Sequence, residues 1–157
     1  MQLWKQPPRV LYRVLRQLPS PLQKLLFYLG AAKITLGASA IIWDREGRVL
    51  LVHHTYRRPA WGFPSGLVGR REQPADALAR ELREELGVEV SITTLLHAQT
   101  DLQTHHLTLY FKARLHGIPC QNGEEIDQLR YATLQEMAAI AGEPTPSWLL
   151  LSQRNGV

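Results

Sequence analysis

One segment, residues 66–88, limits what this chain can fold into more than any other part of it. Pro74 suits the first turn of a helix, and Gly87 suits the left-handed position that follows a helix. Between them, apolar residues recur at the spacing of a helix with one buried stripe. The segment therefore predicts an amphipathic helix over residues 74–86, whose stripe comprises Ala75, Leu78, Ala79, Leu82 and Leu86.

Three acidic residues of this predicted helix lie side by side. At about 3.6 residues per turn, Glu81, Glu84 and Glu85 fall within an arc of roughly 100°. Like charges at this spacing cost about 0.2–0.5 kcal/mol per pair, and carboxylates in the last turn also oppose the helix dipole. One interpretation is a solvated charged face in which Arg80 pairs with Glu84. The other is a functional site, where bound cations remove both penalties.

The residues before the helix favour the second interpretation. Residues 61–66 read Trp-Gly-Phe-Pro-Ser-Gly and lead into a loop where glycine lets a ligand approach the backbone. With this lead-in, the segment resembles the Nudix hydrolase family. One departure is Ser65, where the family commonly carries glycine. Every fixed position of the family's box is filled, by Gly66, Glu72, Arg80, Glu81, Leu82, Glu84, Glu85, Gly87 and Val88.

The resemblance implies a fold and a metal site. The expected fold class is α/β (α+β), a Nudix-type α/β/α sandwich with a mixed central sheet, preceded by an N-terminal helical extension. The resemblance assigns the metal ligands to Glu81, Glu84, Glu85 and the backbone carbonyl of Ser65, while Gly66 shapes the loop. Mg²⁺ is the expected ion because it prefers hard oxygen ligands, and Mn²⁺ is an expected substitute.

The resemblance also suggests roles in catalysis. Arg80 is expected to orient the carboxylates, and Glu72 is expected to pair with Arg80 and brace the loop. The general base is either Glu84 or an acid from a later loop. Glu125 is the preferred later acid, as an extra metal ligand or base, because the adjacent Ile126 should point into the core. The competing interpretation of Glu125 is a polar turn at the entry to a strand.

Substrate contacts are expected between the second predicted strand and the box. Tyr56 and Trp61 are candidates for stacking on a base, and Arg58 is a candidate for pairing with phosphate. Simple packing is the competing explanation for both aromatic rings.

The rest of the body predicts a mixture of strands and helices. Alternating or β-rich stretches predict the strands, and Thr133 is placed to cap a late helix. Strands are expected at residues 36–43, 48–54, 88–102, 106–115 and 126–131, with a turn at 44–47 and a helix at 134–140.

The first 33 residues have a different character. Residues 1–43 carry six basic and no acidic side chains, whereas the remainder carries 12 basic and 14 acidic ones. Two apolar helical stripes flank residues 19–21, and neither approaches the ~20 residues that span a bilayer. The early arginines and the prolines fit a secretory signal poorly. The stripes comprise Val10, Leu11, Val14, Leu15 and Leu18, then Leu22, Leu25, Leu26 and Leu29.

Three uses of this extension stay open. It packs on the domain, forms a homodimer interface, or lies on an anionic membrane surface. Nucleic-acid binding is disfavoured because the segment lacks regularly interleaved aromatic residues. The expected organisation is a basic amphipathic helical extension over residues 1–33 and a Nudix hydrolase domain over residues 34–157.

Composition is that of an ordinary globular protein, with 45% hydrophobic and 20% charged residues. Cys120 is the only cysteine, which excludes an internal disulfide and predicts a cytoplasmic location.

Two classes of function fit these features. The leading one is a Mg²⁺-dependent pyrophosphohydrolase acting on a small nucleotide, either a nucleoside diphosphate linked to another moiety or a nucleoside triphosphate. The alternative is a non-catalytic Nudix module that binds a nucleotide or a partner. The complete acidic set favours the enzyme, because a binding module need not retain every charge.

Overall fold

The computed structural model describes residues 16–31, 33–56, 58–122, 124–141 and 145–154. The chain divides into two compact units, one up to Lys33 and one from Ile34 onward. Each unit is described by itself.

The described part of the first unit contains helix α2 (Ser20–Gly30). A proline occupies its first turn, where the missing amide hydrogen costs nothing. The first predicted stripe lies largely outside the described residues, whereas the second lies within α2. No residue of α2 is buried. Its exposed large apolar side chains are Leu22, Leu25, Leu26, Phe27, Tyr28 and Leu29.

None of the described helices combines the length and the apolar character needed to cross a bilayer.

Helix α3 (Pro74–Leu86) has the bounds that the sequence predicts. Gly87 follows it with φ 65°, and the Gly87 amide donates to the Arg83 carbonyl at 3.1 Å. This is the left-handed cap that glycine adopts without steric cost. The buried stripe differs in two details: Ala77 rather than Ala75 or Ala79 joins the buried leucines, and Glu85 is buried as well.

The second unit contains a four-stranded mixed sheet in the order β4-β1-β6-β5. Its central pair, β1 and β6, is parallel, and both outer pairings are antiparallel. Because β1 and β6 pair in parallel, the start of β1 lies beside the start of β6 although the two strands are far apart in sequence. The strands are β1 (Thr35–Ile42), β4 (Ser65–Leu67), β5 (Glu89–Asp101) and β6 (His106–His116).

A second, three-stranded sheet has the order β3-β2-β7 and is antiparallel throughout. It comprises β2 (Val49–His54), β3 (Trp61–Gly62) and β7 (Ile126–Ala132). Strand β3 leads directly into β4 of the other sheet, so the segment that precedes the box connects both sheets.

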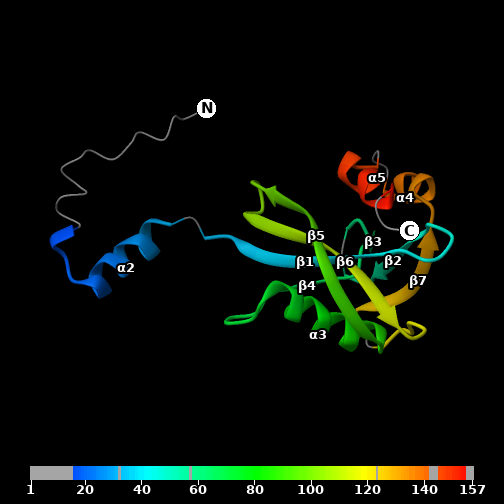
Figure 1. Cartoon of the computed structure of the whole chain (residues 1–157), viewed down its shortest axis with the longest axis horizontal. Coiled ribbons are helices and arrows are strands. Elements are labelled where there is room, and N and C mark those ends of the chain that lie inside the picture. Colours follow the sequence, from blue (N-terminus) through cyan, green and yellow to red (C-terminus); the bar gives the residue numbers. More distant parts are fainter. Residues whose placement is uncertain (1–15, 32, 57, 123, 142–144, 155–157) are drawn as a thin grey trace. The chain divides into compact units, whose positions relative to one another are not determined.

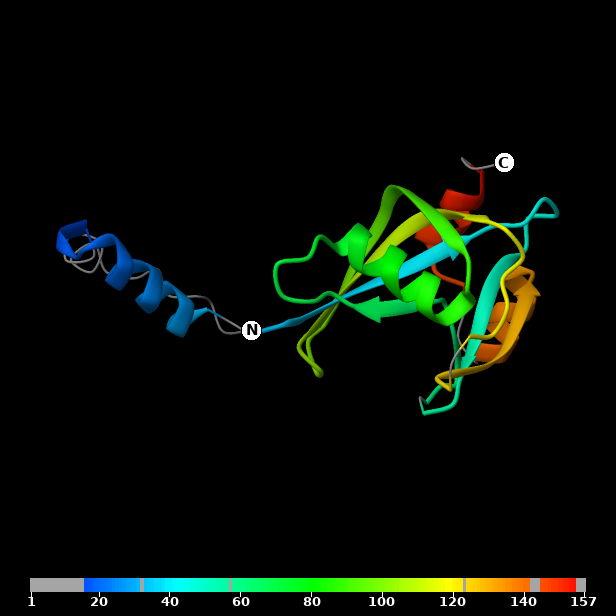
Figure 2. The same ribbon diagram turned by 90° about the horizontal axis from the view of Figure 1, so that it is seen from below.

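The two sheets lie between helices on opposite faces (Figures 1 and 2). Alternate residues of β1 separate the two cores, since Ala38, Ala40 and Ile42 pack with α3 whereas Ile41 packs on the other side. That other side is covered by α4 (Leu134–Ala141) and α5 (Ser147–Arg154). The predicted α/β/α sandwich with a mixed sheet is confirmed.

Three short elements are not predicted by the sequence. Strands β3 and β4 have two and three residues, too few to show a period of two, and α5 has eight. Strand β6 contributes side chains to both cores. Phe111, Ala113 and Leu115 pack toward α3, but Tyr110 packs in the opposite core.

Helix α4 begins with the cap that the sequence predicts. The Glu136 amide donates to Thr133 Oγ1 at 3.2 Å, and the Thr133 amide donates to Glu136 Oε2 at 2.8 Å. We expect Thr133→Ala to lower the free energy of unfolding by about 1 kcal/mol. The melting temperature should fall by about 2–4 °C. Gln135→Ala, at an exposed neighbouring position, is the control; equal losses in both variants would contradict a specific cap.

Candidate functional site

Strand β4 contacts helix α3 at Gly66. A Cβ atom built on Gly66 would lie 2.0 Å from Glu81 Cγ and 2.5 Å from its Cδ. Glycine is required here because the backbone of β4 lies directly against the stem of the Glu81 side chain. We call Glu81, Glu84 and Glu85 the acidic cluster. The contact with Gly66 fixes Glu81, the first acid of this cluster, beside β4.

Arg80 and Glu72 form a bidentate pair across the loop. Arg80 Nε donates to Glu72 Oε1 at 3.0 Å, and Nη2 donates to Oε2 at 3.2 Å. Glu72 Oε2 also accepts from the Gly69 amide at 3.0 Å. The bond from Arg80, followed by that from Gly69, lowers the pKa of Glu72. The loop is therefore held to the helix by a carboxylate that stays ionised at neutral pH.

The same guanidinium reaches two acids of the cluster. Arg80 Nη1 donates to Glu81 Oε1 at 3.0 Å and to Glu84 Oε2 at 3.4 Å. The Arg80–Glu84 pair of the charged-face interpretation is thus present, although it is the longest of these bonds. The pKa of Arg80 is raised, chiefly by Glu72 and then by Glu81.

The three acids of the cluster occupy different environments. The side chain of Glu84 is 60% exposed, that of Glu81 is 22% exposed, and Glu85 is buried at 8% exposure. An exposed carboxylate and a buried one on the same turn differ in solvation, so they are suited to different roles.

The donor set fits a hard divalent cation. Carboxylate oxygens are the ligands that Mg²⁺ prefers. Three carboxylates bond to the single Arg80 guanidinium, and Glu85 adds a fourth carboxylate on the same helix, so negative charge is in excess. Among the described residues, no three acidic, histidine or cysteine side chains are grouped as a metal site. Ion binding would therefore require side-chain rotation, which is fast for the exposed Glu84.

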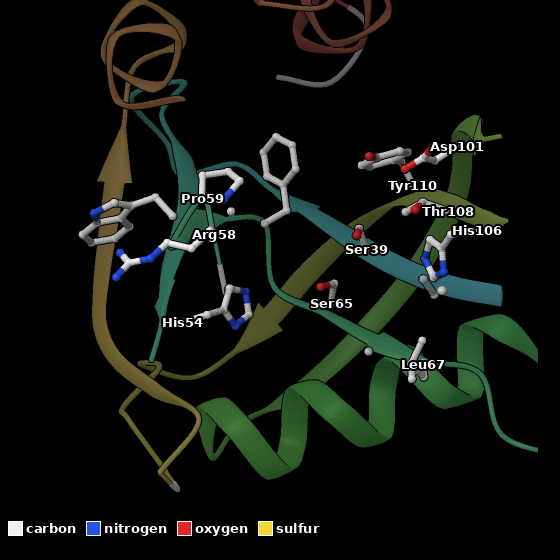
Figure 3. Close-up of a pocket in the computed structure, with 16 residues that line it drawn as sticks. Ser39, His54, Arg58, Pro59, Ser65, Leu67, Asp101, His106, Thr108 and Tyr110 are labelled. Carbon is white, nitrogen blue, oxygen red and sulfur yellow. The ribbon is translucent and has the colours of Figure 1, made fainter. Parts of the chain in front are cut away.

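A pocket of about 680 Å³ opens on the other side of β4. Figure 3 shows Ser65 and Leu67 on β4, with Ser39, Thr108 and Tyr110 on the side of β4 away from α3. Because Ser65 and Gly66 line the pocket and Gly66 also contacts Glu81, the acids and the pocket share one strand as their boundary. A molecule in the pocket can thus present one end to the acidic cluster.

Two of the three predicted substrate residues line this pocket. Arg58 and Trp61 both do, and Phe63 adds a third aromatic or basic side chain from the same segment. Tyr56 is outside the lining; its hydroxyl donates to Glu125 Oε2 at 3.3 Å.

Glu125 lies at the start of β7, where its backbone carbonyl accepts from the Thr55 amide at 3.0 Å. It does not line the pocket. Its link to Tyr56 connects it to the segment that carries Arg58 and Trp61.

The sequence did not predict the wall of the pocket that β5 and β6 form. Its polar groups come from the β5–β6 hairpin, which the parallel pairing of β6 brings beside β1. The only sequence signal was the small Gly37-Ala38-Ser39 run in β1, which leaves room above the strand. The missed lining residues with polar side chains are Asp101, His106, Thr108 and Tyr110 of this hairpin and Ser39 of β1.

Comparisons with known proteins agree with this geometry. The family model described as NUDIX domain matches residues 33–150. An 8-oxo-dGTP diphosphatase of Proteus vulgaris is 35% identical over 78 residues, which cover 47% of this chain and 70% of that protein. An RNA pyrophosphohydrolase of Hydrogenovibrio crunogenus is 39% identical over 67 residues, which cover 43% of this chain but only 40% of that protein.

Structural similarity extends over most of the chain. The crystal structure of a MutT NUDIX hydrolase from Burkholderia pseudomallei matches with a TM-score of 0.63 and 24% identity. The match covers 80% of this chain and 100% of that chain, and at this identity it shows the fold alone. Because the family model matches well over half of the sequence, this chain belongs to the Nudix hydrolase family.

Proposed function

We propose that the protein is a divalent-metal-dependent pyrophosphohydrolase of nucleoside diphosphate derivatives. Its substrate is a nucleoside diphosphate linked to another moiety, or a nucleoside triphosphate. The observation that carries the proposal is the shared boundary at Gly66, which separates an acidic cluster from a pocket of nucleotide size. Relatives named diphosphatase and pyrophosphohydrolase support the same reaction class.

Glu81, Glu84, Glu85 and the backbone carbonyl of Ser65 would hold the metal, with Mg²⁺ as the preferred ion and Mn²⁺ as a substitute. When bound, the ion supplies charge neutralisation at the diphosphate and orients the leaving phosphate. Arg80 acts as an orienting group rather than a substrate contact, because its donors already bond to acids of the loop and the helix.

A carboxylate must accept the proton of the attacking water. Glu84 is the first candidate because it is the most exposed acid of the cluster, and its long bond to Arg80 at 3.4 Å is weak enough to let it rotate toward the phosphate. Glu125 is the second, and Tyr56 helps to orient its carboxylate. General-base groups of this kind contribute about 10²–10⁴-fold to rate.

The nucleoside occupies the pocket. Trp61, Phe63 and Tyr110 offer aromatic faces or edges for a base, and Arg58 offers a cation for phosphate. The near-equal mixture of polar and apolar lining residues suits a molecule with a flat ring and a hydroxyl-bearing sugar.

A substrate panel tests the proposal against a non-catalytic binding module. Nucleoside triphosphates, nucleoside diphosphate sugars, dinucleoside polyphosphates and RNA with a 5′-triphosphate are incubated with and without Mg²⁺. The proposal predicts metal-dependent cleavage of at least one of the nucleotides. A protein that binds a nucleotide but releases no phosphate or nucleoside monophosphate across the panel would favour the binding module.

The N-terminal extension is expected to be dispensable for chemistry. All proposed site residues lie between Ser39 and Glu125, and the family match begins at residue 33. Deleting residues 1–33 should therefore leave kcat within about threefold of the full chain. This is a far smaller effect than loss of a catalytic group. A larger loss of kcat in a folded truncated protein would show that the extension contributes to the site.

The same truncated protein separates the open uses of the extension. A membrane role predicts that only the full chain sediments with anionic phosphatidylserine vesicles, because a basic amphipathic helix binds anionic lipid. A dimer role predicts that only the full chain elutes as a dimer. If the extension packs on the domain, truncation should lower the melting temperature and change neither vesicle sedimentation nor elution.

A further inference from the structure

The loop after β6 crosses the C-terminal end of helix α3. We call residues 117–122 the clamp loop. The last carbonyls of a helix lack partners within the helix, so they depend on donors from elsewhere. Here the clamp loop supplies a donor to each of three consecutive carbonyls at the end of α3, namely those of Glu84, Glu85 and Leu86.

Asn122 makes two of these three bonds. Its side-chain Nδ2 donates to the Glu84 carbonyl at 3.0 Å, and its backbone amide donates to the Glu85 carbonyl at 2.9 Å. The Cys120 amide donates to the Leu86 carbonyl at 3.0 Å. The residues held in this way include two of the three acids of the cluster.

These donors act at the C-terminal end of α3, where acidic side chains are least stable. The C-terminal turn carries the negative end of the helix dipole, and Glu84 and Glu85 add negative charge to it. Amide hydrogens placed on the carbonyls offset part of that charge. They also stop the last turn from fraying, so the directions in which the two carboxylates leave the helix are fixed.

The segment after Asn122 is attached at a second point. The Thr55 hydroxyl donates to the Glu124 carbonyl at 3.1 Å, and the Thr55 amide donates to the Glu125 carbonyl at 3.0 Å. Asn122 therefore lies between two anchors. One is the turn that bears Glu84 and Glu85, and the other is the start of β7 with Glu125.

We propose that Asn122 is a positioning residue that aligns the acids at the end of α3 with each other and with Glu125. It touches neither phosphate nor metal itself. It acts through the Glu84 and Glu85 carbonyls, so its loss misplaces carboxylates without removing any. This inference rests on the proposed function, since it assumes that those carboxylates bind the metal.

The test compares Asn122→Ala with Gln121→Ala in the full-length protein. Gln121 is the matched control because it is also an exposed amide of the clamp loop, but its side chain donates to the Asp127 carbonyl instead. Calorimetric titration with Mn²⁺ in the absence of nucleotide should show affinity about tenfold or more weaker in Asn122→Ala, the range expected for a residue that orients metal ligands. Gln121→Ala should match the parent.

Steady-state kinetics provide the second readout. Asn122→Ala should lower kcat about tenfold with KM changed by no more than about twofold, since the nucleoside pocket is untouched. Asn122→Asp keeps the shape of the side chain but loses its donor, so it should be at least as impaired as the alanine variant. Parent-like Mn²⁺ affinity and kcat in Asn122→Asp would overturn the role of the donor.

Hydrogen exchange in the unmodified protein keeps the proposal testable if a variant fails to fold. The Cys120 and Asn122 amides should exchange slowly, whereas unprotected exchange at both would overturn the clamp. The outcomes separate the two claims. A parent protein that hydrolyses nothing contradicts the proposed function, while an active parent whose metal affinity and kcat survive Asn122→Ala contradicts only this inference.

Discussion

Glu84→Gln and Glu85→Gln should each lower kcat by at least ~10²-fold, the lower range for loss of one acid–base group. Glutamine preserves the shape of each side chain and removes its charge, so the change is confined to metal binding and proton transfer. The two residues differ in exposure, at 60% for the Glu84 side chain and 8% for Glu85. Loss of rate in both variants would therefore not be explained by burial alone.

The measurement is kcat at saturating Mg²⁺ on the best substrate of the panel, with the melting temperature recorded for each variant. Glu89→Gln is the control. Glu89 lies just beyond α3 and pairs with Arg83 at 2.7 and 2.8 Å, at the exposed surface. This variant should retain kcat within about twofold, because an exposed ion pair contributes little. Full metal-dependent activity in both Glu84→Gln and Glu85→Gln would contradict the assignment of the site.

Gly66→Ala should lower kcat by a similar factor, of at least ~10², although it removes no functional group. The added methyl would lie 2.0 Å from Glu81 Cγ, much closer than two carbon atoms can approach. Glu81 must then rotate away, and its bond to Arg80 Nη1 at 3.0 Å breaks. An acid of the cluster is thereby displaced by a change on the neighbouring strand.

A double variant tests whether the clash with Glu81 causes the effect of Gly66→Ala. Overpacking of this kind costs about 1–3 kcal/mol of folding free energy. If the clash with Glu81 is responsible, Glu81→Ala added to Gly66→Ala should recover part of that stability but not the activity, because only Glu81 Cβ, 2.8 Å from the added methyl, then remains in the way. Such a non-additive result is expected for residues in contact. Gly62→Ala is the folding control, because no atom lies within 4 Å of its added methyl. Strictly additive stability losses for Gly66 and Glu81 would contradict the contact.

The sequence predicted those elements that carry a long periodic pattern of apolar residues, or a residue that marks where the element begins or ends. Helix α3 was predicted to the residue because proline, an apolar stripe and a left-handed glycine agree along 13 residues. Thr133 likewise marks the start of α4. By contrast, the two-residue β3 and the three-residue β4 form only because they pair with β2 and β1, which no local pattern records.

The same distinction applies to the site. The box residues are close in sequence, so their spacing identified the acids and the loop glycine, and the resemblance to the Nudix family suggested the Glu72–Arg80 pair. Asp101, His106 and Tyr110 reach the pocket only because β6 pairs in parallel with β1, a contact across about 70 residues. Asn122 likewise reaches Glu84 across 38 residues. Long-range pairing of this kind leaves no periodic signal in a single sequence.

A crystal structure of the protein with Mg²⁺ and a non-hydrolysable nucleotide analogue would show whether the acids of α3 hold the metal against a diphosphate. We expect an ion ligated by oxygens of Glu81, Glu84 or Glu85 at about 2.0–2.1 Å, with the diphosphate mimic completing its coordination. The nucleoside should lie in the pocket between Arg58 and Tyr110. Electron density for the analogue elsewhere, with the three carboxylates directed into solvent and no ion between them, would contradict the account.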